Sequence, residues 1–190
     1  MNKCVIKSRA KAAKGRLARL AITTMMVSVF NVAAAHAENP GTAISPAPAS
    51  STDGKYLDAD GNPTFKIDPD GKVDWYTYSG FLRYHSECHV CHGPDGLGSS
   101  YAPALADSLK TMDYQTFVQT VVQGRKNLTS GNENVMPSFG VNKNVMCYLD
   151  DIYTYLRARA VGDLPRARPT NHDPKPQSAR AADEACMGPE

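Results

Sequence analysis

The chain has 190 residues, of which 42% are hydrophobic, so its length allows at most one ordinary domain beside any targeting segment. Its formal charge of +2 is unevenly spread, because seven of the 21 basic residues and none of the 19 acidic residues lie within the first nineteen positions. Without that segment, 14 basic residues face 19 acidic ones, and the resulting charge of −5 argues against nucleic-acid binding and favours a partner with a basic patch.

The N-terminal segment has the pattern of a secretory signal peptide. Its basic start is followed by an apolar stretch from Leu20 to Ala35, which ends in a small-residue cleavage pattern at Ala37. The stretch is shorter than the roughly 20 residues that a membrane-spanning helix needs. We therefore expect cleavage after about Ala37, export to the periplasm, and no stable membrane insertion. Cys4 would leave with the signal peptide.

The next segment contains two similar turn sequences. Residues 39–53 lack periodicity and are interpreted as a flexible tether. Asp58–Gly61 and Asp68–Gly71 then flank an alternating run, residues 64–67, and together predict a short hairpin. A calcium loop is the alternative, but the twelve-residue EF-hand pattern with its closing glutamate is absent.

Three helices are predicted by apolar periodicity. The first covers Trp75 to Cys88, the second Asp113 to Gln123 with Gly124 as its stop, and the third about Asn144 to Ala160. Residues 161–190 are polar and rich in proline. Four arginines, at the end of the third helix and in this tail, fit a solvated helix end and tail better than a docking patch: Arg157, Arg159, Arg166 and Arg168.

Residues 88–92 form the sequence Cys88-His89-Val90-Cys91-His92. Two thiols separated by two residues can each form a thioether to a haem vinyl group, and the following imidazole is then placed to ligate the iron. A redox-active pair would require a βαβ context, and a zinc site would require a second pair of ligands. The motif therefore predicts one covalent haem c, attached through Cys88 and Cys91 and ligated by His92.

A haem iron held in this way needs a sixth ligand, and Met136 is the candidate. It lies in the sequence Val135-Met136-Pro137, after a stretch rich in glycine and asparagine that we interpret as an irregular loop. Ligation by His92 and Met136 would fill both axial positions and leave no open site, so the protein is expected to carry electrons and not to be an enzyme. His85 and His89 are not expected to be ligands, and His85 is expected on the exposed side of the first helix.

Residues 75–160 resemble the class I cytochromes c. The resemblance rests on the spacing of Gly80, Tyr84 and Cys88, on the glycines after His92, on Pro103-Ala104-Leu105 and on Tyr155-Leu156. It implies an all-α fold around the haem, in which the small residue and the aromatic of the first helix pack against the last helix. It also implies that the Pro103 carbonyl accepts a hydrogen bond from the ring of His92 and orients it.

More narrowly, the chain resembles four-cysteine c-type cytochromes of methanol metabolism, which serve PQQ-dependent methanol dehydrogenases. The matching stretches are residues 75–84, 87–99, 134–139, 146–149 and 183–186. The resemblance implies that a PQQ-dependent methanol or alcohol dehydrogenase donates electrons singly, and that another cytochrome c or an oxidase receives them. The alternatives are a carrier for a different periplasmic dehydrogenase, or a haem enzyme or gas sensor with an open iron site.

The two cysteines outside the haem motif are Cys147 and Cys186. An even number of cysteines in an exported protein favours an intramolecular disulfide that ties the tail to the third helix. Two free thiols, or a bond from the tail to another chain, are the alternatives. The expected organisation is thus a signal peptide (1–37), a linker and Asp-Gly-rich extension (38–74), a cytochrome domain (75–160) and a tethered tail (161–190).

Overall fold

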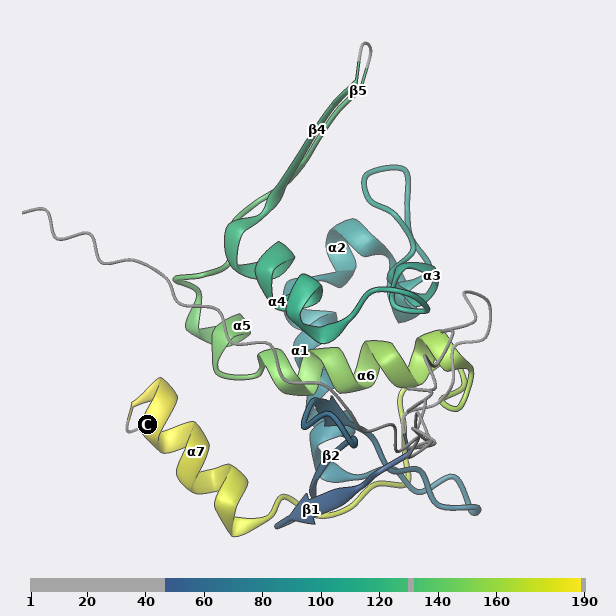
Figure 1. The fold of residues 1–190 in the computed structure, drawn as a ribbon, viewed down its shortest axis with the longest axis vertical. Coiled ribbons are helices and arrows are strands. Elements are labelled where there is room, and N and C mark those ends of the chain that lie inside the picture. Colours follow the sequence, from purple (N-terminus) through teal and green to yellow (C-terminus); the bar gives the residue numbers. More distant parts are fainter. Residues whose placement is uncertain (1–46, 130–131, 189–190) are drawn as a thin grey trace, which may run out of the picture. The chain divides into compact units, whose positions relative to one another are not determined.

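The computed structural model describes residues 47–129 and 132–188, so the predicted signal peptide, Cys4 and the first part of the predicted tether lie outside the described residues. The described part is mostly helical (Figure 1). Its longer helices are α1 (Trp75–Glu87), α4 (Tyr114–Gln123), α6 (Leu149–Val161) and α7 (Gln177–Met187), and its short helical turns are α2 (His89–His92), η1 (Pro94–Gly96), α3 (Leu105–Ser108) and α5 (Lys143–Met146).

Helices α1 and α6 cross at close range and form the centre of the hydrophobic core. A Cβ atom at Gly80 of α1 would overlap the backbone oxygen of Asp151 on α6 and would lie 2.9 Å from the Cβ of Tyr155. Tyr84 and Tyr155, both fully buried, pack beside this crossing with ring centroids 5.4 Å apart. The predicted packing of the first helix against the last is confirmed.

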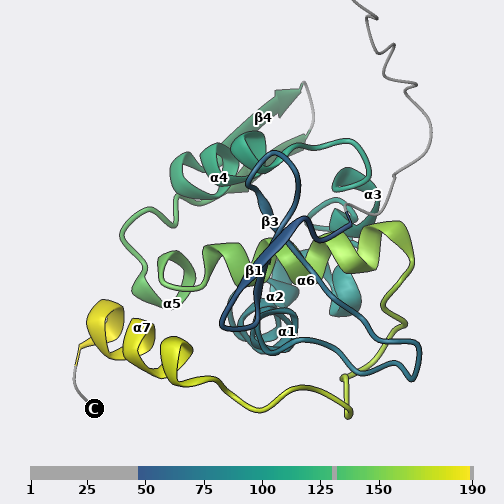
Figure 2. The same ribbon diagram turned by 60° about the horizontal axis from the view of Figure 1, so that its bottom comes forward.

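The predicted helices are confirmed with small changes at their ends. Asp74 and Asp113 cap α1 and α4, because each side chain accepts a hydrogen bond from the backbone N–H three residues later. The third predicted helix is divided into α5 and α6, since Tyr148 between them adopts non-helical angles. Helix α4 also packs on α6 (Figure 2), where Tyr153 contacts the rings of Tyr114 and Phe117.

The N-terminal segment forms a small antiparallel sheet in the order β1-β2-β3, with strands Ser50–Thr52, Lys55–Leu57 and Pro63–Thr64. The interpretation of residues up to 53 as a flexible tether is therefore wrong for residues 50–53. Asp53 and Gly54 both have positive φ angles and close a tight turn between β1 and β2, a device that matches the twist of paired strands. The sequence did not predict strand β1 because the strand is short and wholly exposed, so it has no alternation of apolar and polar residues.

Both Asp-Gly sequences form tight turns, as predicted. Asp58–Gly61 joins β2 to β3, and Asp68–Gly71 closes a second turn in which Ile67 bridges to Val73. The segment after them belongs to the core, since Phe65 and Val73 are buried. Lys55 on β2 also forms a 2.6 Å ion pair with Asp150 on α6. The extension is therefore packed onto the helices by both apolar and charged contacts.

A two-stranded antiparallel ribbon stands between α4 and α5, where the sequence was interpreted as an irregular loop. Strands β4 (Arg125–Thr129) and β5 (Asn132–Met136) pair along their whole length and extend away from the helices (Figure 1). The loop prediction is wrong because backbone pairing between the two strands compensates for the low strand propensity of asparagine. The ribbon places Met136 at its base.

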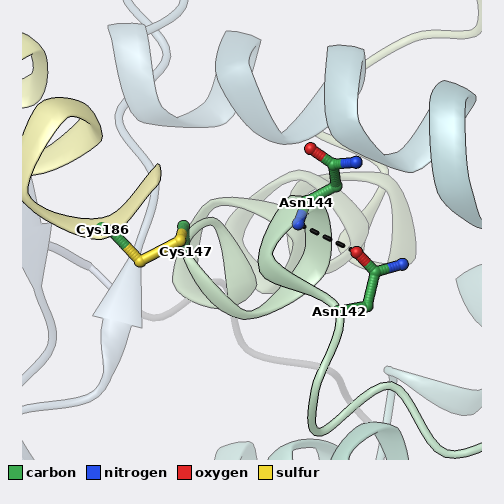
Figure 3. Close-up of a disulfide and its surroundings, with 4 residues drawn as sticks. All are labelled: Asn142, Asn144, Cys147 and Cys186. Carbon is green, nitrogen blue, oxygen red and sulfur yellow. Dashed lines mark hydrogen bonds between the residues drawn. A yellow bond between two sulfur atoms is a disulfide. The ribbon is translucent and has the colours of Figure 1, made fainter. Parts of the chain in front are cut away.

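The predicted disulfide between Cys147 and Cys186 is confirmed, with Cα atoms 5.8 Å apart. It joins the end of α5 to α7 (Figure 3), a helix that the polar pattern of residues 161–190 did not predict. The side chain of Asn142 caps α5 by accepting a hydrogen bond from the N–H of Asn144 at 2.9 Å. None of the helices in the described residues combines the length and apolar character needed to cross a membrane.

Candidate haem site

The Cys-x-x-Cys-His sequence lies on one helical turn at the end of α1. Cys88 ends α1, and its carbonyl accepts hydrogen bonds from the backbone N–H groups of Cys91 at 3.2 Å and His92 at 3.0 Å. Positions three and four apart lie on the same side of a helical turn. Both cysteines are free thiols, one half-buried and the other exposed. Burial raises the pKa of the Cys88 thiol to about 12.

His92 is buried and its ring orientation is fixed. Its Nδ1 atom lies 2.9 Å from the carbonyl oxygen of Pro103, the contact that the family resemblance implies. Nδ1 therefore carries the proton and donates, and Nε2 keeps its lone pair for a metal. The backbone N–H of Gly98 also donates to the His92 carbonyl at 2.7 Å, which holds the following turn against the same residue.

The turn after His92 begins at Gly93, whose position is fixed by contacts with Gly98 and Tyr84. Gly93 has a φ angle of +73°, and a Cβ atom there would overlap the carbonyl oxygen of Gly98, so a side chain is excluded on both counts. The hydroxyl of buried Tyr84 donates a 2.5 Å hydrogen bond to the Gly93 carbonyl. Sequence reasoning assigned Tyr84 a packing role and missed this bond, because a helical pattern gives spacing but not the partner of a hydroxyl group.

Met136, the proposed sixth ligand, belongs to a separate element and is the last residue of β5. It is partly buried and packs against the same hydrophobic core as Cys88. Gly124, which ends α4 with a φ angle of +74°, approaches it so closely that a Cβ atom there would lie 2.5 Å from the Met136 carbonyl oxygen. Strand pairing with Arg125 and the Gly124 contact thus determine where the Met136 backbone lies.

The two other histidines near the motif belong to an aromatic cluster. His85 is half-buried and not on an exposed helix face as expected, because its ring packs 4.1 Å from the ring of Phe81 and its Nδ1 contacts the Phe81 carbonyl. His89 stacks on His85 at 5.7 Å. In each ring one nitrogen is already engaged by the carbonyl four residues earlier, which is a structural role.

Four arginines after residue 156 form hydrogen bonds within the chain. The prediction of a solvated helix end and tail is therefore wrong for half-buried Arg157 and Arg159, whereas Arg166 and Arg168 are exposed as predicted. Arg157 donates to the Lys110 carbonyl at 3.2 Å, and Arg168 donates to the hydroxyl of Tyr78 at 2.5 Å. Arg159 and Arg166 both bond to Asp95, a buried residue of the turn after His92. The charge pattern missed these bonds because all of their acceptors are distant in the sequence.

Large apolar side chains that are mainly exposed surround the motif in sequence. Val90 lies inside it, and Leu97 and Tyr101 follow it, with exposed fractions of 74%, 45% and 75%. The sequence around the motif therefore contributes apolar side chains to the protein surface.

Comparisons with known proteins bear on the family to which the chain belongs. No protein-family model matches the chain. It is 51% identical over 134 residues to cytochrome c-553I of Paracoccus denitrificans, which covers 70% of the chain and 59% of that relative. It is 40% identical over 94 residues to cytochrome c-555 of Methylococcus capsulatus, covering 49% of the chain and 70% of the relative.

Among solved structures, the crystal structure of the c-type cytochrome XoxG from Methylobacterium extorquens AM1 superposes with a TM-score of 0.69 at 56% identity. The match covers 75% of the chain and 87% of that structure. The chain belongs to the class I c-type cytochromes. Members of this family carry covalently bound haem c, which is therefore the cofactor of this cytochrome.

The residues present fit a haem c group. The two free thiols are the chemistry needed for two thioethers, and the buried imidazole has one nitrogen committed to Pro103 and the other available. The chain spans 59% of the length of its Paracoccus relative, so the activity and partners of that whole protein are not transferred directly.

Proposed function

We propose that this cytochrome is a single-haem electron carrier in which Cys88 and Cys91 form the thioethers and His92 and Met136 are the axial ligands. The observation that carries the proposal is the His92 ring, fixed by its 2.9 Å contact with Pro103 beside two free cysteines. Haem c, when bound, supplies a one-electron iron couple. No enzymatic role is proposed.

The chain's own residues hold and close the site. The Pro103 carbonyl accepts a hydrogen bond from the Nδ1–H group of His92, which keeps the ring oriented and makes Nε2 a better electron-pair donor to a metal. Met136, whose backbone is fixed by Gly124 and by the β4–β5 pairing, would hold the iron through its thioether sulfur. With both axial positions filled, small ligands are excluded from the metal.

The proposed electron donor is a PQQ-dependent methanol or alcohol dehydrogenase in the periplasm, and the acceptor is another cytochrome or an oxidase. The sequence likeness to methanol-related cytochromes and the N-terminal signal pattern support this assignment. Redox partners of this kind meet through small, transient interfaces, and complementary charge mainly accelerates their encounter.

The ligation is tested by optical spectra of the purified periplasmic protein in its oxidised and reduced forms. We expect the weak near-infrared band of sulfur-ligated ferric haem, its loss in Met136→Ala, and its retention in Met187→Ala, a control at the exposed end of α7. A native spectrum without the band, or binding of carbon monoxide at ordinary concentrations, would instead indicate an open iron site and favour an enzyme or sensor.

The donor is tested by stopped-flow reduction of this cytochrome with purified PQQ-dependent methanol dehydrogenase from the same organism. The rate should fall as ionic strength rises, because screening weakens steering between opposite charges. A reduction rate that does not change with ionic strength would contradict electrostatic docking. Absence of reduction, in a protein that other reductants reduce normally, would reject the dehydrogenase as donor and leave the carrier function standing.

A further inference from the structure

A buried carboxylate follows the proposed ligand His92 by three residues. Asp95 is 7% exposed and adopts a left-handed backbone conformation, with a φ angle of +59°. Aspartate tolerates this conformation better than most residues, yet a charged side chain is seldom buried unless it is paired. Asp95 therefore requires partners that compensate for its burial.

The partners of Asp95 come from the last turn of α6 and from the segment after it, 64 to 72 residues later in the sequence. One carboxylate oxygen accepts a 3.3 Å bond from Nε of Arg166, and the other accepts a 3.2 Å bond from the backbone N–H of Ala167. The Asp95 carbonyl also accepts a 3.3 Å bond from Nε of Arg159. Three donors thus hold one residue of the turn that follows His92.

Ala167 is itself in an unfavourable conformation, with a φ angle of +93°. Non-glycine residues in such regions cost about 1–3 kcal/mol and persist only where surrounding contacts impose them. Here the two residues with unfavourable backbone angles are bonded to each other. The contact is therefore a specific link between the turn 93–98 and the segment 164–168.

The turn held by Asp95 is the one that holds His92. The backbone N–H of Gly98, at the end of the turn, donates to the His92 carbonyl. The hydroxyl of Tyr84 donates to the carbonyl of Gly93, at the start of the turn, so both ends of the turn are held by hydrogen bonds. The negative charge of Asp95 also acts on the buried Tyr155. Burial is the main cause that raises the pKa of Tyr155, and the negative charge of Asp95 raises that pKa further. The Asp95 carboxylate is therefore close enough to act on the buried aromatic side chains.

We propose that Asp95 is a positioning residue of the haem site that links the turn after His92 to the segment after α6, and that its charge favours the oxidised state of the bound haem. Arg166 offsets part of that charge from the solvent side, where its side chain is 66% exposed. This inference rests on the proposed function, because it assumes that His92 ligates the iron.

Two variants with opposite charge changes test the electrostatic part. Asp95→Asn keeps an oxygen to accept from Ala167 and removes the negative charge, so the equilibrium constant for one-electron reduction should rise by up to about tenfold, or 59 mV. Arg166→Gln removes the compensating cation and should lower that constant by a smaller factor. The measurement is a spectroelectrochemical titration of the purified cytochrome at pH 7.

Asp107→Asn is the matched control, because Asp107 is exposed and pairs only with the neighbouring Lys110 among the ion pairs of the described residues. It removes the same charge and should leave the potential unchanged. If Asp95→Asn behaves like this control, or if both test variants move the potential in the same direction, the electrostatic role of Asp95 is rejected.

The positioning part is tested by Asp95→Ala, which removes both acceptor oxygens. It should lower the unfolding midpoint more than Asp95→Asn does, and equal midpoints would reject the link. The near-infrared band serves as the internal check. If it is absent from the unmodified protein, the proposed ligation fails, whereas a normal band with no shift in Asp95→Asn means that only this inference fails.

Discussion

His92 is held by hydrogen bonds from several segments of the chain, whereas Met136 is held by one close glycine and one paired strand. On the His92 side, Pro103, Gly98 and Tyr84 all contribute bonds to the residue or its turn. On the Met136 side, Gly124 and the register with Arg125 fix the backbone.

The difference indicates a division of roles. The His92 turn is bonded to Tyr84, which packs at the α1–α6 crossing, so a change in that crossing should lower the free energy of unfolding. The Met136 side lies at the base of a ribbon that extends from the helices (Figure 1), so a change there should alter ligation before it alters folding. The predictions below test this contrast.

The largest effect is expected for Gly80→Ala at the α1–α6 crossing. The new methyl group would overlap the backbone of Asp151, and the helices must separate to admit it. We expect a loss of about 3 kcal/mol or more in the free energy of unfolding. Chemical denaturation measures it, with Ser86→Ala on the exposed part of the same helix as the control. A stable Gly80→Ala protein would contradict the close crossing.

Removal of the disulfide, in the double variant Cys147→Ser and Cys186→Ser, should cost about 2–4 kcal/mol. The bond spans 39 residues and tethers α7 to the end of α5, so its loss increases the conformational entropy of the unfolded chain more than that of the folded chain. The near-infrared band should persist, because Gly124 and the ribbon, not the tail, position Met136. Loss of the band in the folded variant would show that the tail supports ligation.

Gly93→Ala and Gly124→Ala compare the two sides directly, since both residues have φ angles near +73° and both approach a neighbouring backbone. Each should cost about 1–3 kcal/mol. Gly93→Ala should reduce stability more, whereas Gly124→Ala should weaken the near-infrared band at temperatures where the protein stays folded. Parallel thermal scans by circular dichroism and absorbance separate the two outcomes. The reverse pattern would contradict the proposed division of roles.

The last prediction concerns a slope, namely how the stability of the α1–α6 crossing depends on pH. Burial raises the pKa of Asp151 to about 7, although a bond with Ser79 and the charge of Lys55 lower it and nearby Asp150 and Asp74 raise it. Between the unfolded value near 4 and the folded value near 7, the folded state holds the extra proton, so stability falls as pH rises through this window.

Asp151→Asn should abolish that decline, which amounts to about 1 kcal/mol per pH unit. Urea denaturation at pH 5, 6 and 7 measures the slope, and the exposed Asp107→Asn should keep the slope of the unmodified protein. An unchanged slope in Asp151→Asn would mean that another group titrates in this window.

Part of the fold was predictable because it depends on local patterns. Apolar spacing located α1 and α4, and Asp-Gly pairs located two tight turns. The ribbon was missed because its strands are stabilised by pairing with each other and not by propensity. Helix α7 was missed because residues 177–187 lack a broad apolar stripe, and the disulfide at Cys186 is what holds the helix to α5.

For the site, the sequence by itself determined the chemistry: two thiols, an imidazole and a thioether at spacings that predict one covalent haem c. Only the tertiary structure decided what surrounds them. The bond from Tyr84 to Gly93, the link from Asp95 to Arg166 and Ala167, and the approach of Gly124 to Met136 join residues that are separated along the chain. Covalent motifs are local and can be recognised in a sequence, whereas hydrogen bonds and close packing between distant segments form only when the backbone brings those segments together.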